Sequence, residues 1–311
     1  MSTTDPQSTS GSESLRVTLL GTGSPIPDAH RAGPSTLVTA GSGLDASHYL
    51  VDAGRGVLMR LAGAGVAVGQ LSAVLITHMH SDHITDLSDV ITTRWVMGFE
   101  PTPLVIVGPH GTREMVDHIL AMLGPDIGYR MAHHADLDYR PPLEVIEVEE
   151  GRVDLPGGAT VWCAPTDHKP VHPSIGFRFE HDGTAAVLAG DTIPCEGLDR
   201  LCSVDVAGEA APAGALVHTV IRKDVIGAIG LQRLTDTMDY HSSPEEAAQT
   251  AARNGVGTLV LTHFVPTVPP VGGDDWRDLA AGHFEGEIVI GEDLLSVAVA
   301  GAHSPTVTPG A

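Results

Sequence analysis

The sequence predicts an α/β protein in which two β-sheets pack face to face and helices cover their outer faces. Two observations indicate this arrangement. Short runs rich in Val, Leu and Ile recur along the chain between Gly, Pro and Ser residues, which is typical of strands and turns. Each half of the chain also starts with a run of strands and continues with alternating strands and helices, an order that suggests packed layers.

The first half of the chain is predicted to contain six strands and three helices. Strands are expected over residues 15–21, 35–40, 48–54, 71–78, 104–109 and 143–150. Helical spacing predicts helices over residues 55–65, 82–99 and 112–123.

The second half repeats this order. Strands are expected over residues 159–165, 174–182, 184–191, 214–220, 257–264, 287–293 and 294–300. A helix over 242–255 has clear end signals, because Ser243 can cap it, Pro244 can open it, Glu246 can complete a capping box and Gly255 can end it.

The domain organisation is predicted to be simple. Residues 1–14 are rich in Ser and Thr, and residues 301–311 are similar in character, so both tails are expected to be disordered or flexible. Residues 15–300 contain no linker long enough to divide them, and we expect a single domain there.

The charge balance argues against a typical nucleic-acid-binding surface. The 311 residues include 17 Lys and Arg against 39 Asp and Glu, a net charge of −22, and only two residues are lysines, Lys169 and Lys223. Proteins that bind nucleic acids normally carry a basic stripe. A grip on a long RNA should therefore be weak and sharply dependent on salt.

Cysteine content and hydropathy indicate a cytoplasmic protein. The three cysteines form no CxxC pair, which favours neither a disulfide framework nor a cysteine zinc site. The N-terminus lacks the apolar segment of a secretory signal. The longest apolar run is shorter than the ~20 residues of a membrane helix, so no membrane contact is expected.

The stretch ITHMHSDHITDL places four candidate metal ligands within six positions: His78, His80, Asp82 and His83. Residues two apart on an extended segment point to the same side, so the first two imidazoles can face one point. Ser81 is predicted to cap the next helix, which Asp82 and His83 would open. Imidazole and carboxylate ligands without thiolate suit Zn(II), Mn(II) or Fe(II).

Three further polar residues directly follow apolar runs. They are His168 in CAPTDHKP, Asp191 in LAGDT and His263 in VLTHF. Each alone could cap a strand end. Together with the first four they give seven candidate ligands, which is enough for two metals.

With these residues the chain resembles the metallo-β-lactamase superfamily, whose fold is an αββα sandwich. The resemblance implies that His78, His80 and His168 hold one zinc, that Asp82, His83 and His263 hold a second, and that Asp191 bridges them. It also implies that Asp52 in LVDAG supports the ligands without binding metal. True β-lactamases usually have Cys or Ser where this chain has Asp191, and diiron flavoproteins have Glu in place of His80.

Within the superfamily, LLGTGSPIPDAHRAGPST, YHSSPEEAA and VLTHFVP resemble ribonuclease Z, which trims tRNA 3′ ends. The resemblance implies a homodimer, and it implies that His241 acts on the leaving group. The segment ALVHTVIRKD matches the family's His-Glu-Ala-Thr segment in part: His218 is kept, but Thr219 stands where Glu is expected.

The expected mechanism is hydrolysis by a hydroxide that bridges the two metals. Asp82 would orient this hydroxide and take its proton, and His241 would protonate the departing oxygen as a general acid. Lys169, Lys223 and His218 are candidate substrate-binding residues for a phosphate or sulfate group.

Substrate size is where the chain departs from the family pattern. Members typically carry a long basic arm between the ligands that match His168 and Asp191, but here the gap holds only a two-strand hairpin. Three hypotheses stay open: a phosphodiesterase of the ribonuclease Z type that processes tRNA, a relative that hydrolyses small aryl sulfates or phosphodiesters, and a metal-binding module without turnover.

Overall fold

A computed structural model describes residues 15–266 and 273–300, which form two sheets packed face to face. The predicted tails, 1–14 and 301–311, lie outside the described residues. The first sheet has the order β14-β1-β2-β3-β4-β5-β6 and the second the order β13-β12-β11-β10-β9-β8-β7. The predicted αββα sandwich is therefore confirmed.

The described part of the first sheet contains seven strands. They are β1 (Leu15–Gly21), β2 (Ser35–Ala40), β3 (Ser47–Val51), β4 (Leu71–Leu75), β5 (Leu104–Gly108), β6 (Leu143–Glu147) and β14 (Ser296–Ala298). Strands β3 to β6 run parallel to one another, whereas β14, β1, β2 and β3 pair antiparallel.

The described part of the second sheet also contains seven strands. They are β7 (Gly151–Val153), β8 (Thr160–Pro165), β9 (Ile175–His181), β10 (Thr184–Leu188), β11 (Ala215–Ile221), β12 (Thr258–Val265) and β13 (Glu287–Ile290). Strands β10 to β13 are parallel. Their carboxyl ends therefore lie at one edge, where ligands are commonly bound in open α/β sheets.

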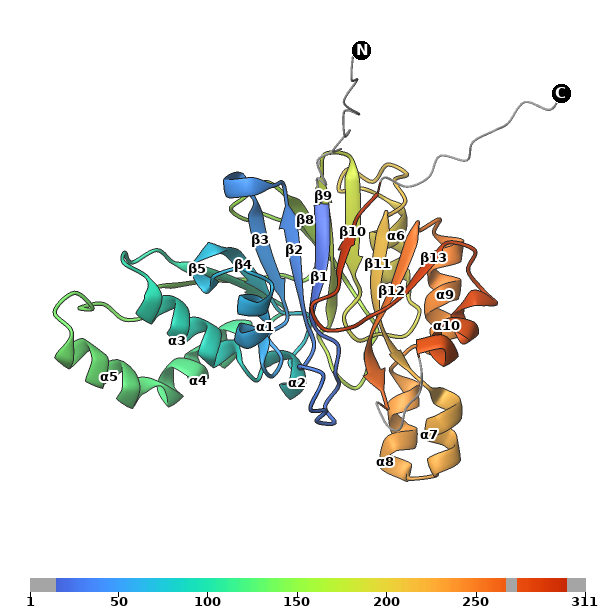
Figure 1. Cartoon of the computed structure of the whole chain (residues 1–311), viewed down its shortest axis with the longest axis horizontal. Helices are drawn as coiled ribbons and strands as arrows, with labels where there is room; N and C mark the ends of the chain where they lie inside the picture. Colours follow the sequence, from blue (N-terminus) through green and yellow to red (C-terminus); the bar gives the residue numbers. More distant parts are fainter. Residues whose placement is uncertain (1–14, 267–272, 301–311) are drawn as a thin grey trace, which may run out of the picture.

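The helices cover the two outer faces. On the side of the first sheet lie α1 (Val57–Gly63), α2 (Ser81–Ile84), α3 (Leu87–Met97), α4 (Thr112–Met122) and α5 (Gly124–His133), and on the side of the second lie α6 (Glu196–Ser203), α9 (Pro244–Arg253) and α10 (Gly273–Ala281) (Figure 1). Three short 3₁₀ helices are η1 (Gly43–Asp45), η2 (Val68–Gln70) and η3 (Asp236–Asp239).

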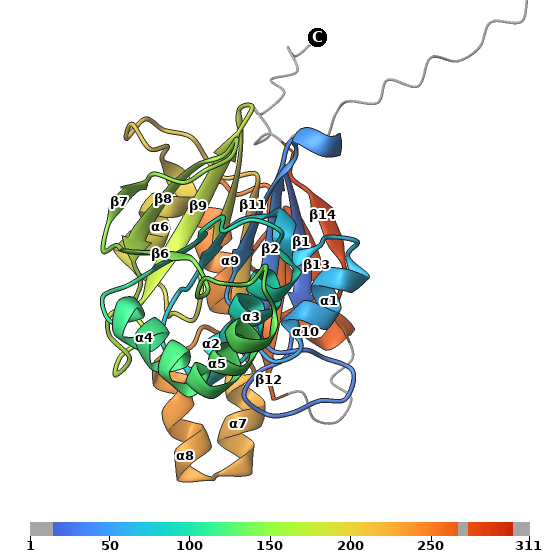
Figure 2. The same cartoon turned by 90° about the vertical axis from the view of Figure 1, so that its left-hand side faces the viewer.

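A pair of short helices extends from the sandwich. These are α7 (Lys223–Ile229) and α8 (Gln232–Thr235), which project beyond the end at which α2 lies (Figures 1 and 2). Ile226 of α7 packs with Ile221 and Val265 at the ends of β11 and β12, and this contact fixes the base of the pair. No helix among the described residues is long and apolar enough to cross a membrane.

Three apolar clusters hold these layers together. One lies between the sheets and includes Val17 and Val51 from the first sheet and Phe177 and Val217 from the second. A second packs the first sheet against α1, α3 and α4, and a third packs the second sheet against α6, α9 and α10. Burial of apolar surface stabilises such layers by roughly 25 cal/mol per Å² removed from water.

One predicted helix differs from the structure, because the helix expected over 82–99 is divided into α2 and α3. The helix expected over 112–123 is confirmed as α4. The sequence did not predict α5, α6, α7, α8 and α10. The helix expected over 242–255 is confirmed as α9. Its capping box is present, since Ser243 Oγ accepts a hydrogen bond from the Glu246 amide at 3.3 Å and the Ser243 amide donates to Glu246 Oε2 at 2.8 Å.

Candidate metal centre

The histidine cluster follows β4 and enters α2. Residues 78–80 are not helical, and α2 begins at Ser81, so Asp82 and His83 lie in its first turn. The N-cap is His80 and not Ser81 as predicted. Its side chain makes no capping bond, and its Nδ1 atom lies 3.1 Å from Nε2 of His168. Two imidazole nitrogens at this separation are arranged like two ligands of one ion.

Asp191, which follows β10, lies at the middle of the cluster. Its Oδ2 atom lies near the Nε2 atom of five histidines, at 3.8 Å from His78, 3.4 Å from His83, 3.8 Å from His168, 3.2 Å from His241 and 3.5 Å from His263. All five histidines and the aspartate are buried. A single carboxylate oxygen thus faces nitrogens from four separate segments of the chain.

The potential ligand atoms fall into three overlapping groups, and within each group they all lie within 4.8 Å of one another. The groups are His78, His80, His168 and Asp191; Asp82, His83 and His263; and Asp191, His241 and His263. The first two groups bring together the seven ligands predicted from the sequence. The third adds His241, which was predicted to act on the leaving group.

Unpaired polar atoms test whether these residues fit a metal. Nε2 of His78, Nε2 of His83 and Oδ1 of Asp191 are buried and have no hydrogen-bond partner among the described residues. Buried polar atoms are normally paired, because leaving one unpaired costs about 1–3 kcal/mol. A divalent ion held between these nitrogens and oxygens would satisfy them, so the residues fit a metal.

A second layer of hydrogen bonds orients the imidazoles. Asp52 Oδ2 lies 2.7 Å from Nδ1 of His83, and Asp52 Oδ1 accepts from the Thr77 amide at 2.8 Å. The Thr77 hydroxyl lies 3.0 Å from Nδ1 of His78. The backbone carbonyl of Tyr240 accepts from Nδ1 of His168 at 2.9 Å. In these three histidines, His78, His83 and His168, Nδ1 is therefore hydrogen-bonded and Nε2 faces Asp191. Metal-binding histidines use this arrangement.

Burial keeps three of the candidate ligands neutral. Burial lowers the pKa of His168 to about 4 and lowers the pKa of His78 and of His80 as well. These imidazoles are therefore unprotonated at neutral pH, and their lone pairs are free to bind a cation.

The same cluster keeps its carboxyl groups ionised. Burial acts to raise the pKa of Asp191, but His263 and His83 outweigh it and hold this pKa well below its usual value. The pKa of Asp82 is also lowered: burial acts to raise it, but the hydrogen bond from His263 and the charges of His83 and His263 together outweigh that effect. Two carboxylates thus carry negative charge toward the place where a cation would lie.

His241 belongs to the centre. Its Nδ1–H donates to the carbonyl of Thr237 at 3.0 Å, and its Nε2 faces Asp191. The predicted leaving-group residue and the predicted bridging ligand are therefore direct neighbours.

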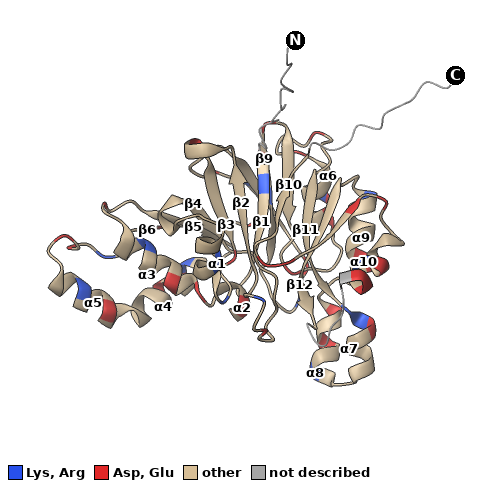
Figure 3. Cartoon of the chain, in the orientation of Figure 1, with Lys and Arg blue, Asp and Glu red and all other residues tan. Residues whose placement is uncertain are grey.

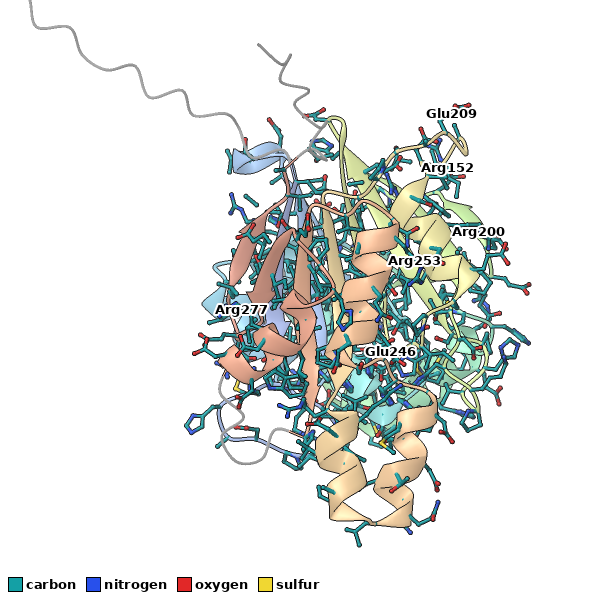
Figure 4. All side chains as sticks on the ribbon, turned by 90° about the vertical axis from the view of Figure 1, so that its right-hand side faces the viewer. Arg152, Arg200, Glu209, Glu246, Arg253 and Arg277 are labelled. Atoms are coloured by element: carbon teal, nitrogen blue, oxygen red, sulfur yellow. The ribbon has the colours of Figure 1, made fainter. Side chains whose placement is uncertain are left out.

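Two of the three candidate substrate-binding residues are engaged elsewhere. His218 is fully buried in β11, and its Nδ1–H donates to the Thr219 carbonyl at 2.8 Å, so it cannot meet a substrate as predicted. Its neighbour Thr219 lines a cavity of about 30 Å³ together with Asp52, His83 and His263. Lys223 Nζ lies 2.7 Å from Oε2 of Glu246, which Figure 4 labels at the end of α9 next to α7 and α8.

Lys169 remains accessible to solvent. Its side chain is 76 % exposed, and its ammonium group lies 3.2 Å from Asp167. It directly follows the buried candidate ligand His168, but its ammonium group is paired with the carboxylate of Asp167.

Sequence reasoning missed two residues of the site. Thr77 stands directly before His78 and links Asp52 to the histidines, and Tyr240 stands directly before His241 and touches two rings of the centre. The only signal was their position beside a predicted functional histidine.

The segment between His168 and Asp191 forms β9 and β10 and contains no arm. Asp182 and Gly183 form the tight turn between these strands, with φ values of 46° and 75°, which confirms the predicted hairpin. A cavity of about 590 Å³ runs along the hairpin, but its lining contains none of the seven predicted ligands.

Comparison with known proteins supports the family. The sequence model described as "Beta-lactamase superfamily domain" matches residues 47–264. The chain is 58 % identical over 287 residues to the ribonuclease Z of Mycolicibacterium gilvum, covering 92 % of this chain and 96 % of that protein. It is 57 % identical to the ribonuclease Z of Mycobacterium marinum, covering 92 % of this chain and 99 % of that protein.

Solved structures share the fold. A metallo-β-lactamase fold protein from Bacillus subtilis, YhfI, has a TM-score of 0.66 at 22 % identity and covers 91 % of this chain and 98 % of its own. The short form of human tRNase Z has a TM-score of 0.64 at 21 % identity and covers 92 % and 98 %. Together with the ligand groups, these matches confirm the resemblance seen in the sequence. The chain therefore belongs to the β-lactamase superfamily and, within it, to the ribonuclease Z family of metal-dependent hydrolases.

Proposed function

We propose that this protein is a dizinc phosphodiesterase that cleaves precursor tRNA near its 3′ end. The observation that carries the proposal is the position of Asp191 Oδ2 among the Nε2 atoms of five histidines. A central carboxylate of this kind suits a ligand shared by two ions. The name that the 55–58 % identical relatives bear, ribonuclease Z, supports RNA as the substrate class.

The two ions would be held by the residues predicted from the sequence. His78, His80 and His168 would hold one, Asp82, His83 and His263 would hold the other, and Asp191 would bind both. Nitrogen and carboxylate oxygen ligands favour zinc, with Mn(II) or Fe(II) as alternatives. When bound, two such ions lower the pKa of water and stabilise the charge that develops on an attacked phosphoryl group.

Asp82 would act as the proton acceptor for the attacking water. Its Oδ2 atom lies 3.3 Å from Nε2 of His263 and 3.7 Å from Nε2 of His83, so it stands inside the ligand set. Its lowered pKa keeps it ionised at neutral pH, as a base must be.

His241 would donate the proton to the departing oxygen. The Thr237 carbonyl occupies its Nδ1–H, which leaves Nε2 to face the reacting groups beside Asp191. Nε2 of His241 lies 3.2 Å from Oδ2 of Asp191, at the middle of the candidate ligand set, where the departing oxygen would be protonated.

Lys and Arg are spread singly over several helices and strands, with acidic positions close to many of them (Figure 3). Arg222 lies 2.7 Å from Asp224, and Lys223 and Lys169 are paired as described above. A tRNA would therefore be held by contacts near the scissile bond more than by a long basic surface, with weak overall affinity.

A second candidate function follows from the missing arm. A hydrolase of small aryl sulfates or phosphodiesters needs the same metal centre but no grip on the body of a tRNA. The hairpin of β9 and β10, which replaces an arm, favours this alternative.

Turnover of three substrates by the purified zinc-loaded protein tests these proposals. We expect a single specific cut in a precursor tRNA together with hydrolysis of bis(p-nitrophenyl) phosphate. Cleavage of the small diester or of an aryl sulfate without a specific tRNA cut would favour the second function. No turnover of any of them by fully metal-loaded protein would support a binding module instead.

The family further supports a cytoplasmic homodimer. Sedimentation analysis of the full chain tests the dimer, and a monomer at micromolar concentration would contradict it.

A further inference from the structure

The backbone of Tyr240 is hydrogen-bonded to the candidate metal centre. It follows η3 directly and precedes His241, and its carbonyl accepts the hydrogen bond from Nδ1 of His168. Leu234 and Met238, just before it, pack against the cluster of Ile221, Ile226 and Val265. The main chain at Tyr240 is therefore anchored beside His168 by its own carbonyl and by the packing of the residues before it.

The ring of Tyr240 contacts two histidines of the site. Its centroid lies 5.1 Å from that of His168, with the planes at 80°, and 4.9 Å from that of His241, with the planes at 44°. These are ordinary separations and angles for interacting aromatic rings. The side chain therefore packs on the same two residues that the proposed function uses, one as ligand and one as acid.

Core packing does not account for this ring. Tyr240 belongs to none of the apolar clusters of the described residues, and its side chain is only partly buried. Part of an aromatic surface is thus left available beside the reacting groups.

We propose that Tyr240 is the platform on which an aromatic group attached to the leaving oxygen stacks. This inference rests on the proposed function, in which His241 protonates that oxygen. A group bonded to an oxygen at Nε2 of His241 would lie next to Tyr240, because the two rings are in contact. The group is a planar ring, either the nucleobase of the adjoining nucleotide or the aryl ring of a small ester, since stacking accepts any such ring.

The test compares two diesters whose leaving groups have similar acidity but different shape: methyl phenyl phosphate and methyl hexafluoroisopropyl phosphate. Tyr240→Leu should raise KM for the phenyl ester about tenfold, equivalent to about 1.4 kcal/mol, with kcat little changed and the fluoroalkyl ester unaffected. A loss confined to KM indicates a binding contact. Tyr240→Phe should behave like the unchanged protein, because the ring is kept.

Tyr129→Leu is the matched control, since Tyr129 lies on α5 and its side chain is 75 % exposed. An equal rise in KM for both diesters would overturn the stacking role. So would a Tyr240→Phe variant as impaired as Tyr240→Leu, which would assign the contact to the hydroxyl group. If the unchanged protein cleaves neither diester and makes no specific cut in a precursor tRNA, the proposed function itself fails, and the two failures are thereby distinguished.

A second experiment, with precursor tRNAs, tests whether the ring that stacks on Tyr240 is a nucleobase. Precursor tRNAs with an abasic nucleotide on one side of the scissile bond, and then on the other, are compared with the intact precursor. We expect one of the two abasic positions to raise KM about tenfold in the unchanged protein and to have no further effect in Tyr240→Leu. Additive effects of the abasic nucleotide and the substitution would contradict the stacking of a nucleobase on Tyr240.

Discussion

Oδ2 of Asp52 lies 2.7 Å from Nδ1 of His83, and this contact turns the opposite nitrogen of the ring toward the metal centre. Nε2 of His83 is thereby placed 3.4 Å from Oδ2 of Asp191. Asp52 itself has a φ of 60°, a left-handed conformation that aspartate tolerates better than most residues. Asp52 thus acts on the candidate metal centre through its hydrogen bonds to His83 and Thr77.

Asp52→Ala should weaken zinc binding about 10- to 100-fold, the usual effect of removing a residue that orients a metal-binding histidine. Competition with a chromophoric chelator measures the affinity of the purified protein. Asp45→Ala is the control, because Asp45 lies exposed in η1. Zinc affinity equal to that of the control would contradict the orienting role.

Asp191→Ala should lose both metal content and activity. The substitution removes the oxygen that faces five imidazole nitrogens, and with it the charge that would lie between two ions. Elemental analysis after gel filtration gives the number of ions per chain. Asp167→Ala, at a neighbouring aspartate that pairs with Lys169, is the comparison. A full complement of metal in Asp191→Ala would refute the bridging role.

His241→Ala should keep its metal but lose activity, by about 10²- to 10⁴-fold on esters with poor leaving groups. The reason is that only a poor leaving group needs a proton as its bond breaks. Rates for a series of substituted phenyl diesters measure this dependence. If every ester slows by the same factor, His241 does not act as a general acid.

The grouping of the candidate ligands could be predicted from the sequence because each lies near the end of an apolar run or shortly after it. Parallel strands such as β10 and β12 end at one edge of a sheet, so Asp191 after β10 and His263 near the end of β12 lie close together. The hairpin between His168 and Asp191 could also be predicted, because Asp-Gly is a strong turn signal. These features depend on local pattern and on the direction of the strands alone.

Features that depend on contacts between distant segments could not be predicted. The helix expected over 82–99 breaks because the amide of Ala53 donates to the carbonyl of His83 at 2.7 Å, a carbonyl that a continuous helix would use itself. Likewise, the Asp86 amide donates to the Ala53 carbonyl at 3.0 Å. These bonds connect α2 to the loop after β3 and set the orientation of His83.

The sequence also could not predict which residues of β11 face the candidate metal centre. Neighbouring residues of a strand point to opposite faces, so an error of one residue exchanges the buried and the accessible side. Thr219 faces the cavity beside the ligands, and His218 therefore points to the other face of the sheet. His218, which was predicted to contact a substrate, is therefore the residue that the fold buries.

The burial of His218 should make folding stability sensitive to acid. Burial lowers the pKa of this imidazole to about 4 from its ordinary 6.5, so the folded protein keeps it neutral while the unfolded chain protonates it near 6.5. The folded-state pKa is the lower one. The part of the free energy of unfolding that depends on a neutral His218 is therefore fully present above pH 6.5. It is lost as the pH falls from 6.5 toward 4. Between pH 7 and pH 5 the loss should be about 2 kcal/mol, out of about 3 kcal/mol in total.

His218→Gln tests this contribution, because glutamine does not titrate. Urea unfolding of the metal-free protein at pH 7 and pH 5 gives the free energy of unfolding, and removal of metal avoids the separate effect of acid on metal binding. The unchanged protein should lose about 2 kcal/mol more than His218→Gln between the two pH values. The comparison is between slopes with pH, so a lower stability of the variant at pH 7 does not affect it. Parallel losses in the two proteins would show that His218 is not held neutral by the fold.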